Sequence, residues 1–386
     1  MRHMDTELQK LLFDLKQLAR KPLAQATSMP PGVYTNKNFY RLEEEEIFSK
    51  EWLCAGRAES LPSTGDYLTY EIGAQPIFVI RGGDGELHAF ANVCRHRMMR
   101  LLEGSGHCTR IVCPYHAWTY DISGQLVHAR HMQQTKHFDM SDIQLPSVRC
   151  EIWEGWIFVT LNREIRSVEK RLAPLQKIVK RYRMSKYVEV AREDHTWNTN
   201  WKCLTENFME GYHLPVAHRA TVGAYFPVEA TRFDEDGKTY GAFTYQTFLK
   251  TSEAPVGTAD PANKSLRGRW RNTSVLPTIF PSHMMTLAPD HLWYLSLQPR
   301  GPDKVRIRYG IAFAPELMAK KRGLAKKISN AKAFLDEVQA EDRVVVEGIF
   351  RGAMAPLSRP GALSWLEKEN HEFTRYLAKR VAGGPV

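Results

Sequence analysis

The apolar positions of this chain follow different periods in successive segments. In residues 1–20 they recur three and four apart, which predicts an amphipathic helix. The Pro/Gly break in "SMPPGVY" (28–34) precedes a second short helix, predicted to end near "EEEEIFSKEW" (43–52). From 53 to 163, β-branched and aromatic runs alternate with glycine-rich turns, and "RGGDGEL" predicts a hairpin turn among them. This segment is therefore predicted to be an all-β module.

The rest of the chain mixes the two periods. Residues 164–220 are predicted to be mostly helical, whereas 222–315 carry strand patterns such as "HLWYLSLQPRGPDKVRIRYGIAFAP". Helical periodicity returns from 316 to 350 and in the C-terminal "LSWLEKENHEFTRYLAKRV". We expect an α+β protein with three segments, which comprise residues 1–52, 53–163 and 164–386.

The composition places the chain among globular proteins, with 43% hydrophobic and 25% charged residues in 386. No apolar run reaches the roughly 18 residues that a membrane span needs, and the N-terminal pattern contains acidic residues unlike those of a signal peptide. We therefore expect a cytoplasmic protein without a membrane contact. Six cysteines in such a chain are expected to be free or metal-bound rather than joined in disulfides.

The formal net charge of +10 raises the question of nucleic-acid binding. The basic residues are dispersed, except in "AKKRGLAKKISNAK" (319–332), and no recognition-helix motif accompanies them. We therefore expect no nucleic-acid partner. The basic stretch is interpreted as a solvated helix face, with a docking surface for an acidic electron carrier as the alternative.

Two Cys/His pairs stand out in the all-β module. "NVCRHR" contains Cys94 and His96, and "CPYHAWTY" contains Cys113 and His116. A Cys2His2 zinc finger places both cysteines before both histidines, whereas each pair here mixes one thiolate with one imidazole. This order favours a Rieske-type [2Fe–2S] cluster, whose potential lies at roughly −150 to +300 mV against about −400 mV for all-Cys plant-type clusters. A structural zinc site is the alternative.

A second candidate metal site lies in "NWKCLTENFMEGYHLPVAH" (200–218). We expect one helix that ends at a bend caused by Pro215, which disfavours helical backbone before it. Four polar side chains would then share one face of this helix: Glu206, Asn207, Glu210 and His213. The bend would bring His213 and His218 together. Two imidazoles and one carboxylate with open positions form the facial triad of non-haem Fe(II) oxygenases.

The missing carboxylate is expected in "AFLDEVQAEDRVVVEGIF" (333–350). Asp342 shares its helix face with apolar residues, namely Leu335, Val338, Val345, Val346 and Ile349. An acid within an apolar stripe is costly unless it is paired or binds a metal. We therefore favour Asp342 as the ligand, with Glu341, Asp336 and Glu337 as the alternatives.

Together these motifs resemble the catalytic α subunit of the Rieske non-haem iron oxygenases, the aromatic-ring-hydroxylating and oxidative demethylating family. The resemblance spans nearly the whole chain, from "NVCRHR" to the closing "LSWLEKENHEFTRYLAKR". It implies two cofactors, a Rieske [2Fe–2S] cluster and a mononuclear Fe(II). Their implied ligands are Cys94, Cys113, His96 and His116 for the cluster, and His213, His218 and Asp342 for Fe(II).

The resemblance also implies the fold and the route of the electron. The larger domain would be a helix-grip fold, an antiparallel sheet around a long helix, beside which the Rieske module is inserted. Glu210, three residues before His213, would bridge His213 of one subunit to His116 of its neighbour in a homotrimer. Such a carboxylate orients both imidazoles. Asn207 matches a further family residue near the iron.

Three positions depart from the usual pattern of the family. Glu210 replaces a more common Asp, as in members that act on quaternary amines such as carnitine. Met98 and Ala117 stand where many members have glycine, which could alter the packing of the loops but leaves the ligands untouched. Candidates for the substrate-facing surface are aromatic residues between 220 and 300: Tyr225, Phe226, Phe280, Trp293 and Tyr294. They would suit a quaternary ammonium by cation–π attraction, or a flat ring.

The expected activity depends on a partner protein. No GxGxxG fingerprint opens a helix in this chain, so NAD(P)H-derived electrons should arrive from a flavin or iron–sulfur reductase, possibly through a ferredoxin. O2 and a small organic substrate would react at Fe(II), by ring hydroxylation or by oxidative N-demethylation. A Rieske electron-transfer protein with a non-catalytic binding domain, or a zinc-bearing interaction protein, are the other hypotheses. The oxygenase requires about three irons per chain and the electron carrier about two.

Overall fold

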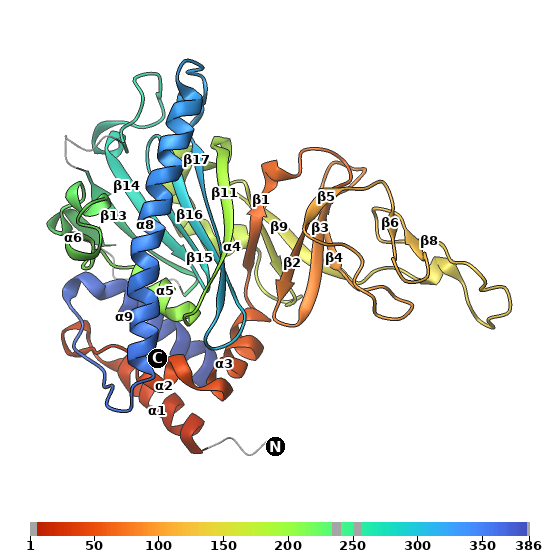
Figure 1. Cartoon of the computed structure of the whole chain (residues 1–386), viewed down its shortest axis with the longest axis horizontal. Coiled ribbons are helices and arrows are strands. Elements are labelled where there is room, and N and C mark those ends of the chain that lie inside the picture. The colour runs from red at the N-terminus through yellow and green to blue at the C-terminus, as the bar shows by residue number, and fades with distance from the viewer. Residues whose placement is uncertain (1–5, 234–240, 251–255, 384–386) are drawn as a thin grey trace. The chain divides into compact units, whose positions relative to one another are not determined.

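Contacts within the chain divide the computed structural model into two units, described over residues 6–233, 241–250 and 256–383. One unit comprises Phe48–Lys170, and the other combines Met1–Ile47 with Arg171–Val386. The larger unit is thus completed by both ends of the chain. Each unit has its own antiparallel sheet (Figure 1).

The smaller unit is built almost entirely from strands, as the alternating pattern of the all-β module predicts. Its main sheet has the order β1-β10-β9-β4-β3-β2-β5, and a small sheet has the order β6-β7-β8. The strands are β1 (Leu53–Arg57), β2 (Asp66–Ile72), β3 (Gln75–Arg81), β4 (Leu87–Ala91), β5 (Ser105–His107), β6 (Ile111–Val112), β7 (Thr119–Tyr120), β8 (Leu126–His128), β9 (Ser147–Trp153) and β10 (Trp156–Thr160).

The core of the smaller unit extends from the main sheet to the two Cys/His loops. Phe78 and Phe90 of the sheet belong to the same buried cluster as Trp118 and Tyr120, which follow the second loop. Cys94 and Cys113 are part of this cluster and are only 2% and 3% exposed. The packing of the module therefore carries both thiols into the protein interior.

The larger unit contains a seven-stranded antiparallel sheet, ordered β11-β17-β16-β15-β14-β13-β12. Its strands are β11 (Val188–Trp197), β12 (Thr231–Phe233), β13 (Phe243–Leu249), β14 (Thr273–Ile279), β15 (His283–Leu287), β16 (His291–Pro299) and β17 (Val305–Phe313). The expectation of mostly helix from 164 to 220 is wrong for β11. Nearly every residue of "VEVAREDHTW" has a partner on the long strand β17, and this long-range pairing decides the local structure.

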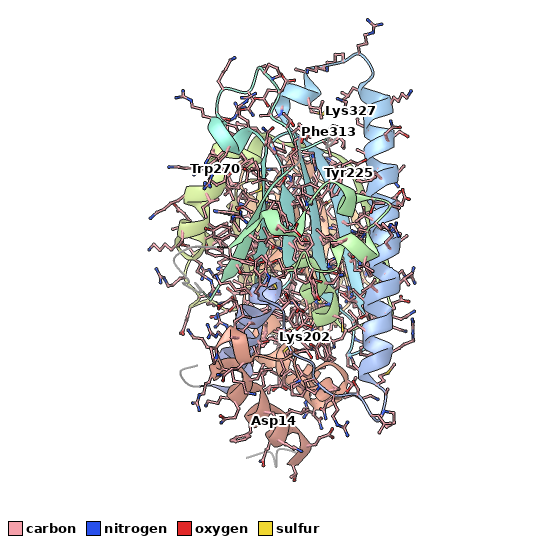
Figure 2. All side chains as sticks on the ribbon, turned by 90° about the vertical axis from the view of Figure 1, so that its left-hand side faces the viewer. Asp14, Lys202, Tyr225, Trp270, Phe313 and Lys327 are labelled. Carbon is pink, nitrogen blue, oxygen red and sulfur yellow. The ribbon has the colours of Figure 1, made fainter. Side chains whose placement is uncertain are left out.

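Helices lie on both faces and at one end of this sheet (Figure 2). They are α1 (Thr6–Arg20), α2 (Pro31–Thr35), α3 (Lys37–Glu43), α4 (Val168–Val179), α5 (Trp201–Phe208), α6 (Leu214–Ala217), α7 (Pro315–Met318), α8 (Leu324–Ala353) and α9 (Lys368–Leu377). The longest of them, α8, crosses the sheet (Figure 1). An antiparallel sheet with a long helix against it confirms the expected α+β class and the helix-grip arrangement.

The helix α8 packs against β11, α2, α5 and α6, and its apolar stripe is buried from Leu335 onwards. Leu335, Val338 and Val346 are buried, and Asp342 lies among them with 9% exposure. Ile349, which the sequence places on the same side, is instead 47% exposed, while Phe350 is buried. The buried stripe shifts around the helix because two turns of 3.6 residues are slightly longer than a repeat of seven residues.

A buried ion pair ties α5 to the N-terminal helices. Lys202 Nζ lies 2.7 Å from Glu43 Oε1, and both side chains are fully enclosed. Trp201 Nε1 donates to Glu43 Oε2, and the aromatic rings of Tyr34 and Phe39 surround the ammonium group. Figure 2 shows Lys202 at the end of the unit where these helices gather. Removing one partner of such a pair would leave an uncompensated charge in the core, so α5 is firmly anchored.

In the part of the chain described by the structure, the helices offer no segment with the length and apolar character needed to cross a membrane.

Candidate metal centres and substrate cavity

The two Cys/His loops of the smaller unit have matching backbone conformations. In the first, Cys94 N–H donates to Met99 O, and Met98 N–H donates back to Cys94 O. In the second, Cys113 N–H donates to Trp118 O, and Ala117 N–H donates to Cys113 O. Each loop is therefore closed by the same pair of bonds, which presents one thiol and one imidazole on a short turn.

Met98 and Ala117, the two departures from glycine, occupy equivalent strained positions. Their φ angles are +57° and +55°, and each residue lies four positions after the cysteine of its loop. A non-glycine residue in this left-handed region costs roughly 1–2 kcal/mol. The closing hydrogen bonds of the loops hold the backbone there, which explains why glycine is the usual residue. Met98 is 80% exposed, so its side chain is not what stabilises this conformation.

Aromatic side chains orient the two histidines at the surface of the module. The His96 ring stacks on Trp118 with centroids 4.7 Å apart, and the His116 ring lies 3.7 Å from that of Tyr115. Burial and the neighbouring His116 lower the pKa of His96, which favours the neutral imidazole that a metal ligand requires. Tyr120 Oη lies 3.3 Å from Cys94 Sγ and accepts from Arg95 N–H.

This arrangement fits a two-iron cluster better than a single zinc ion. Zinc would require all four ligand atoms around one point. Among the described residues, even a group of three such atoms close together is found only elsewhere in the chain. The cysteines are buried, while the His96 and His116 rings lie 4.7 Å apart at the surface. A group with thiolates on its inner iron and imidazoles on its outer iron matches this separation.

The second centre is formed where the chain breaks between two helices. The expected single helix from 200 to a bend at Pro215 is wrong: α5 ends at Phe208, and α6 begins only at Leu214. Pro215 does not cause the bend, because it lies in the first turn of α6, where its missing N–H costs little. His213 caps the start of α6 and His218 follows its end. A one-turn helix therefore brings the two imidazoles together.

His213, His218 and Asp342 form one cluster. Their metal-binding atoms lie within 4.8 Å of one another. His218 Nε2 is 3.0 Å and His213 Nε2 is 3.8 Å from Asp342 Oδ1. Burial opposes protonation of His218, yet Asp342 and Glu341 together raise its pKa. Such a concentration of negative charge around two imidazoles suits a divalent cation, and the donor set is the facial triad of non-haem iron.

A carboxylate holds the other ring nitrogen of each histidine. Glu210 Oε1 lies 2.5 Å from His213 Nδ1, and Glu210 Oε2 accepts the backbone N–H of His213. Glu341 Oε2 lies 2.7 Å from His218 Nδ1 and accepts from Thr221 Oγ1 at 2.6 Å. Glu341 therefore takes the supporting position rather than the ligand position for which it was an alternative. Both Nε2 atoms are left to face the metal.

A cavity of about 120 Å³ opens beside this triad. It is lined by residues of β13–β16, α5, α8 and the segment 210–226. Asn207 lines it together with four of the expected aromatic residues, namely Tyr225, Phe226, Trp293 and Tyr294. Figure 2 shows Tyr225 beside α8. Phe280 is instead core: it packs on Phe373 and Tyr376.

Sequence reasoning missed other residues of this cavity. Phe248 contacts Phe226, and Phe334 contacts Trp293, with centroids 6.1 and 5.8 Å apart. They lie on β13 and α8 and show no pattern that separates them from ordinary core residues. His291, Gln246 and Gln339 also line the cavity. Of these residues, only His291 could have been noticed in the sequence, because it follows an aspartate in "PDHLW" within a largely apolar strand pattern.

Glu206 does not share a surface with Glu210, although the single-helix expectation placed both on one face. Its Oε2 accepts a hydrogen bond of 2.8 Å from Tyr34 Oη, beneath the N-terminal helices. Burial raises the pKa of Glu206 to about 7, against the opposing effects of Tyr34 and Lys202. Glu206 thus supports the anchoring of α5 rather than the metal site.

Comparison with known proteins supports the assignment of both units. Residues 51–139 match the family model of the Rieske [2Fe-2S] domain, and residues 184–383 match that of the ring hydroxylating alpha subunit (catalytic domain). The chain is 32% identical over 277 residues to the carnitine monooxygenase oxygenase subunit of Escherichia coli, covering 69% of this chain and 68% of that protein. It is 27% identical over 379 residues to the choline monooxygenase of Atriplex hortensis, covering 96% and 82%.

Solved structures share the fold along nearly the whole chain. A quaternary ammonium Rieske monooxygenase superimposes with a TM-score of 0.81 at 24% identity, covering 95% of this chain and 98% of that one. Naphthalene 1,2-dioxygenase from Rhodococcus sp. superimposes with a TM-score of 0.78 at 19% identity, covering 98% and 99%.

The role of the triad can be tested by removing one imidazole. In His213→Ala we expect iron to fall from about three to about two per chain, with the red-brown cluster spectrum retained and product formation abolished. Iron analysis, visible absorbance and product assays measure this. As a control, His195→Ala changes a histidine that bonds Glu193 on β11 and should keep all the iron. Product formation by His213→Ala would refute the assignment.

The buried Glu206 predicts a pH dependence of stability. In the folded chain the pKa of Glu206 is about 7, whereas the ordinary pKa of a glutamate is 4.5. The corresponding stabilisation is complete below about pH 4.5 and is lost as the pH rises to about 7, a change of roughly 3 kcal/mol at most. The free energy of unfolding, measured with urea at several pH values in this range, should fall less with pH in Glu206→Gln than in the wild type. The exposed Glu86→Gln should leave the curve unchanged, and a wild-type curve that rises would contradict the prediction.

Proposed function

Since this chain belongs to the Rieske-type ring-hydroxylating oxygenases as a catalytic α subunit, we propose that it hydroxylates an N-methyl carbon of a small quaternary ammonium compound. Members of the family receive NAD(P)H-derived electrons through a separate reductase. The observation that carries the proposal is the charge and aromatic character of the cavity beside the triad. The names of the similar proteins, which include carnitine and choline monooxygenases, agree with it.

The overall reaction would consume one O2, two electrons and two protons for each N-methyl group. One oxygen atom enters a C–H bond to give an N-hydroxymethyl group, and the other leaves as water. An N-hydroxymethyl ammonium then loses formaldehyde and one proton, so that a tertiary amine remains. The electrons originate from NAD(P)H and are delivered by the reductase.

The cavity favours a cation over an anion. Its described lining contains the carboxylates Glu210 and Asp342 but neither lysine nor arginine. The rings of Phe226 and Phe248 form one wall, and an aromatic face attracts an ammonium group by up to about 2 kcal/mol when water is excluded. The amide oxygens of Gln246 and Gln339 are buried without a hydrogen-bond partner among the described residues, and a nearby cation would compensate them.

The protein side chains would hold and orient the reacting centre. We assign Cys94, Cys113, His96 and His116 to the cluster, and His213, His218 and Asp342 to the mononuclear iron. When bound, the iron supplies the activation of O2 and the cluster supplies one electron at a time. Glu210 and Glu341 fix the ring planes by hydrogen bonds to the Nδ1 atoms, and the apolar walls exclude water.

Exposed apolar side chains near both histidines support a head-to-tail arrangement of the homotrimer that the resemblance implies. Near His116, Met98 and Tyr115 are 80% and 53% exposed. Near His213, Tyr212 and Val216 are 58% and 83% exposed. Side chains of this kind on an otherwise polar surface are typical of protein interfaces. Their pairing between subunits would place the outer histidine of one cluster beside Glu210 of the neighbouring subunit.

The substrate class can be tested by following O2 uptake. The purified oxygenase with its reductase should consume O2 with trimethylammonium compounds and release formaldehyde in proportion. Aromatic acids should give neither signal, because the described lining has no lysine or arginine to pair with an acid. Neutral aromatic compounds should also give neither, because they carry no charge for the carboxylates of the cavity to attract. Uptake of O2 with an aromatic compound, coupled to a hydroxylated ring product, would overturn the proposal.

The bridging role of Glu210 predicts a defect confined to electron transfer. In Glu210→Gln, both metals should stay bound and the cluster should be reduced at the normal rate. Reoxidation of the reduced cluster with substrate and O2 should slow by about 10–100-fold, because the amide orients both imidazoles less strongly. Stopped-flow absorbance measures this rate. Glu103→Gln, an exposed change in the smaller unit, is the control; an unchanged rate in Glu210→Gln would refute the bridge.

A further inference from the structure

A histidine–aspartate pair lies at the end of the cavity formed by the start of β16. His291 Nδ1 is 2.7 Å from Asp290 Oδ1, and the His291 side chain is 7% exposed. Both carboxylate oxygens of Asp290 also accept the backbone N–H of Gly257, at 2.9 and 3.0 Å. His291 lines the cavity but takes no part in the metal triad. The reaction as described so far leaves this pair without a role.

The contacts of Asp290 determine which nitrogen of His291 faces the cavity. Although burial opposes its ionisation, His291 and the Gly257 N–H lower the pKa of Asp290, so the carboxylate is ionised and acts only as an acceptor. His291 Nδ1 must then carry the proton that it donates to Asp290. Among the described residues, the hydrogen bond of the His291 ring is the one at Nδ1. An imidazole with one proton, held on Nδ1, has an acceptor lone pair on Nε2 that this bond leaves unused.

An unused donor belongs to the neighbouring aromatic ring. The ring of Trp293 is centred 5.1 Å from that of His291, and Trp293 Nε1 is buried without a hydrogen-bond partner among the described residues. A hydroxyl group is both a donor and an acceptor, so it can satisfy both nitrogens at once. A carboxylate is an acceptor only, so its lone pairs would face the Nε2 lone pair with no hydrogen between them. The pair thus matches an alcohol.

The position of the pair suits the end of the substrate remote from the metal. Trp293 packs against Phe334 of α8 with centroids 5.8 Å apart. Phe334 precedes Asp342 by eight residues, or about 12 Å along the helix axis. A ligand that places its hydroxyl at His291 therefore extends its ammonium group towards the triad.

We propose that His291, oriented by Asp290, is a specificity-determining residue that accepts a hydrogen bond from a substrate hydroxyl, so that the preferred substrate is an ammonium alcohol rather than an ammonium carboxylate. This inference rests on the proposed function and names the part of the substrate that the function leaves open. The lack of lysine and arginine in the described lining agrees with it, because an ammonium carboxylate would bring an anion without a partner.

The test measures binding without turnover. Calorimetric titration of the holoenzyme, with no reductase present, compares (2-hydroxyethyl)trimethylammonium, ethyltrimethylammonium and (carboxymethyl)trimethylammonium. The hydroxyl compound should bind about tenfold more tightly than the ethyl compound, the effect of one hydrogen bond, and the carboxymethyl compound most weakly. His291→Phe should remove the tenfold preference while keeping the affinity for the ethyl compound. His291→Gln, whose amide oxygen can accept, should retain part of the preference.

A matched control and the contrary outcomes complete the test. His107→Phe alters another histidine–aspartate pair, in which His107 Nδ1 lies 2.9 Å from Asp66 in the smaller unit, and should keep the preference. Equal binding of the hydroxyl and ethyl compounds by the wild type, or tightest binding of the carboxymethyl compound, would overturn this inference and leave the proposed function standing. Binding of neutral aromatic compounds with no ammonium compound bound would overturn the proposed function itself.

Discussion

The arrangement on which the larger unit depends is the pairing of each triad histidine with a carboxylate at its Nδ1. Glu210 holds His213 and Glu341 holds His218, so that both Nε2 atoms are turned towards Asp342. The three parts come from different places: a chain break after α5, a one-turn helix, and the middle of α8. Because an imidazole can rotate about its side-chain bonds, proximity alone would not define a metal site. The hydrogen bonds from the carboxylates fix the orientation of both rings. The anchored helices α5 and α8 in turn keep the carboxylates in place.

In the smaller unit, the backbone of the two Cys/His loops holds the candidate ligands in position. Two loops closed by equivalent hydrogen bonds hold Met98 and Ala117 at positive φ, and the strain is tolerated because the surrounding module over-determines the turn. The same core that buries Cys94 and Cys113 leaves His96 and His116 at the surface. If these four residues hold the cluster, as proposed, an electron would leave through the exposed imidazoles rather than through the buried thiolates. The two units thus share one design, in which rigid packing positions a few polar atoms.

Between the triad and the His291–Asp290 pair, the cavity separates two kinds of recognition. Aromatic rings and carboxylates near the metal favour a cation without specifying the rest of the molecule. The acceptor on His291 and the donor on Trp293 can form hydrogen bonds with one polar group at the end of the substrate remote from the metal. Apolar walls supply most of the contact area of a binding site, whereas a few placed polar groups supply its selectivity.

The sequence by itself determined the chemistry of this protein: the Cys/His order, the two further histidines and an acid within an apolar stripe each indicate a ligand through residue type and spacing. It also determined the all-β module and the helical face of Asp342, because both depend on local periodicity. Only the tertiary structure decided that α5 stops at Phe208, that residues 188–197 form a strand, and that Glu341 bonds Nδ1 of His218. It alone placed Phe334, His291 and Gln339 around one cavity and Phe280 outside it. The physical reason is that these outcomes arise from contacts between residues far apart along the chain, which override local propensity and which no spacing within one segment records.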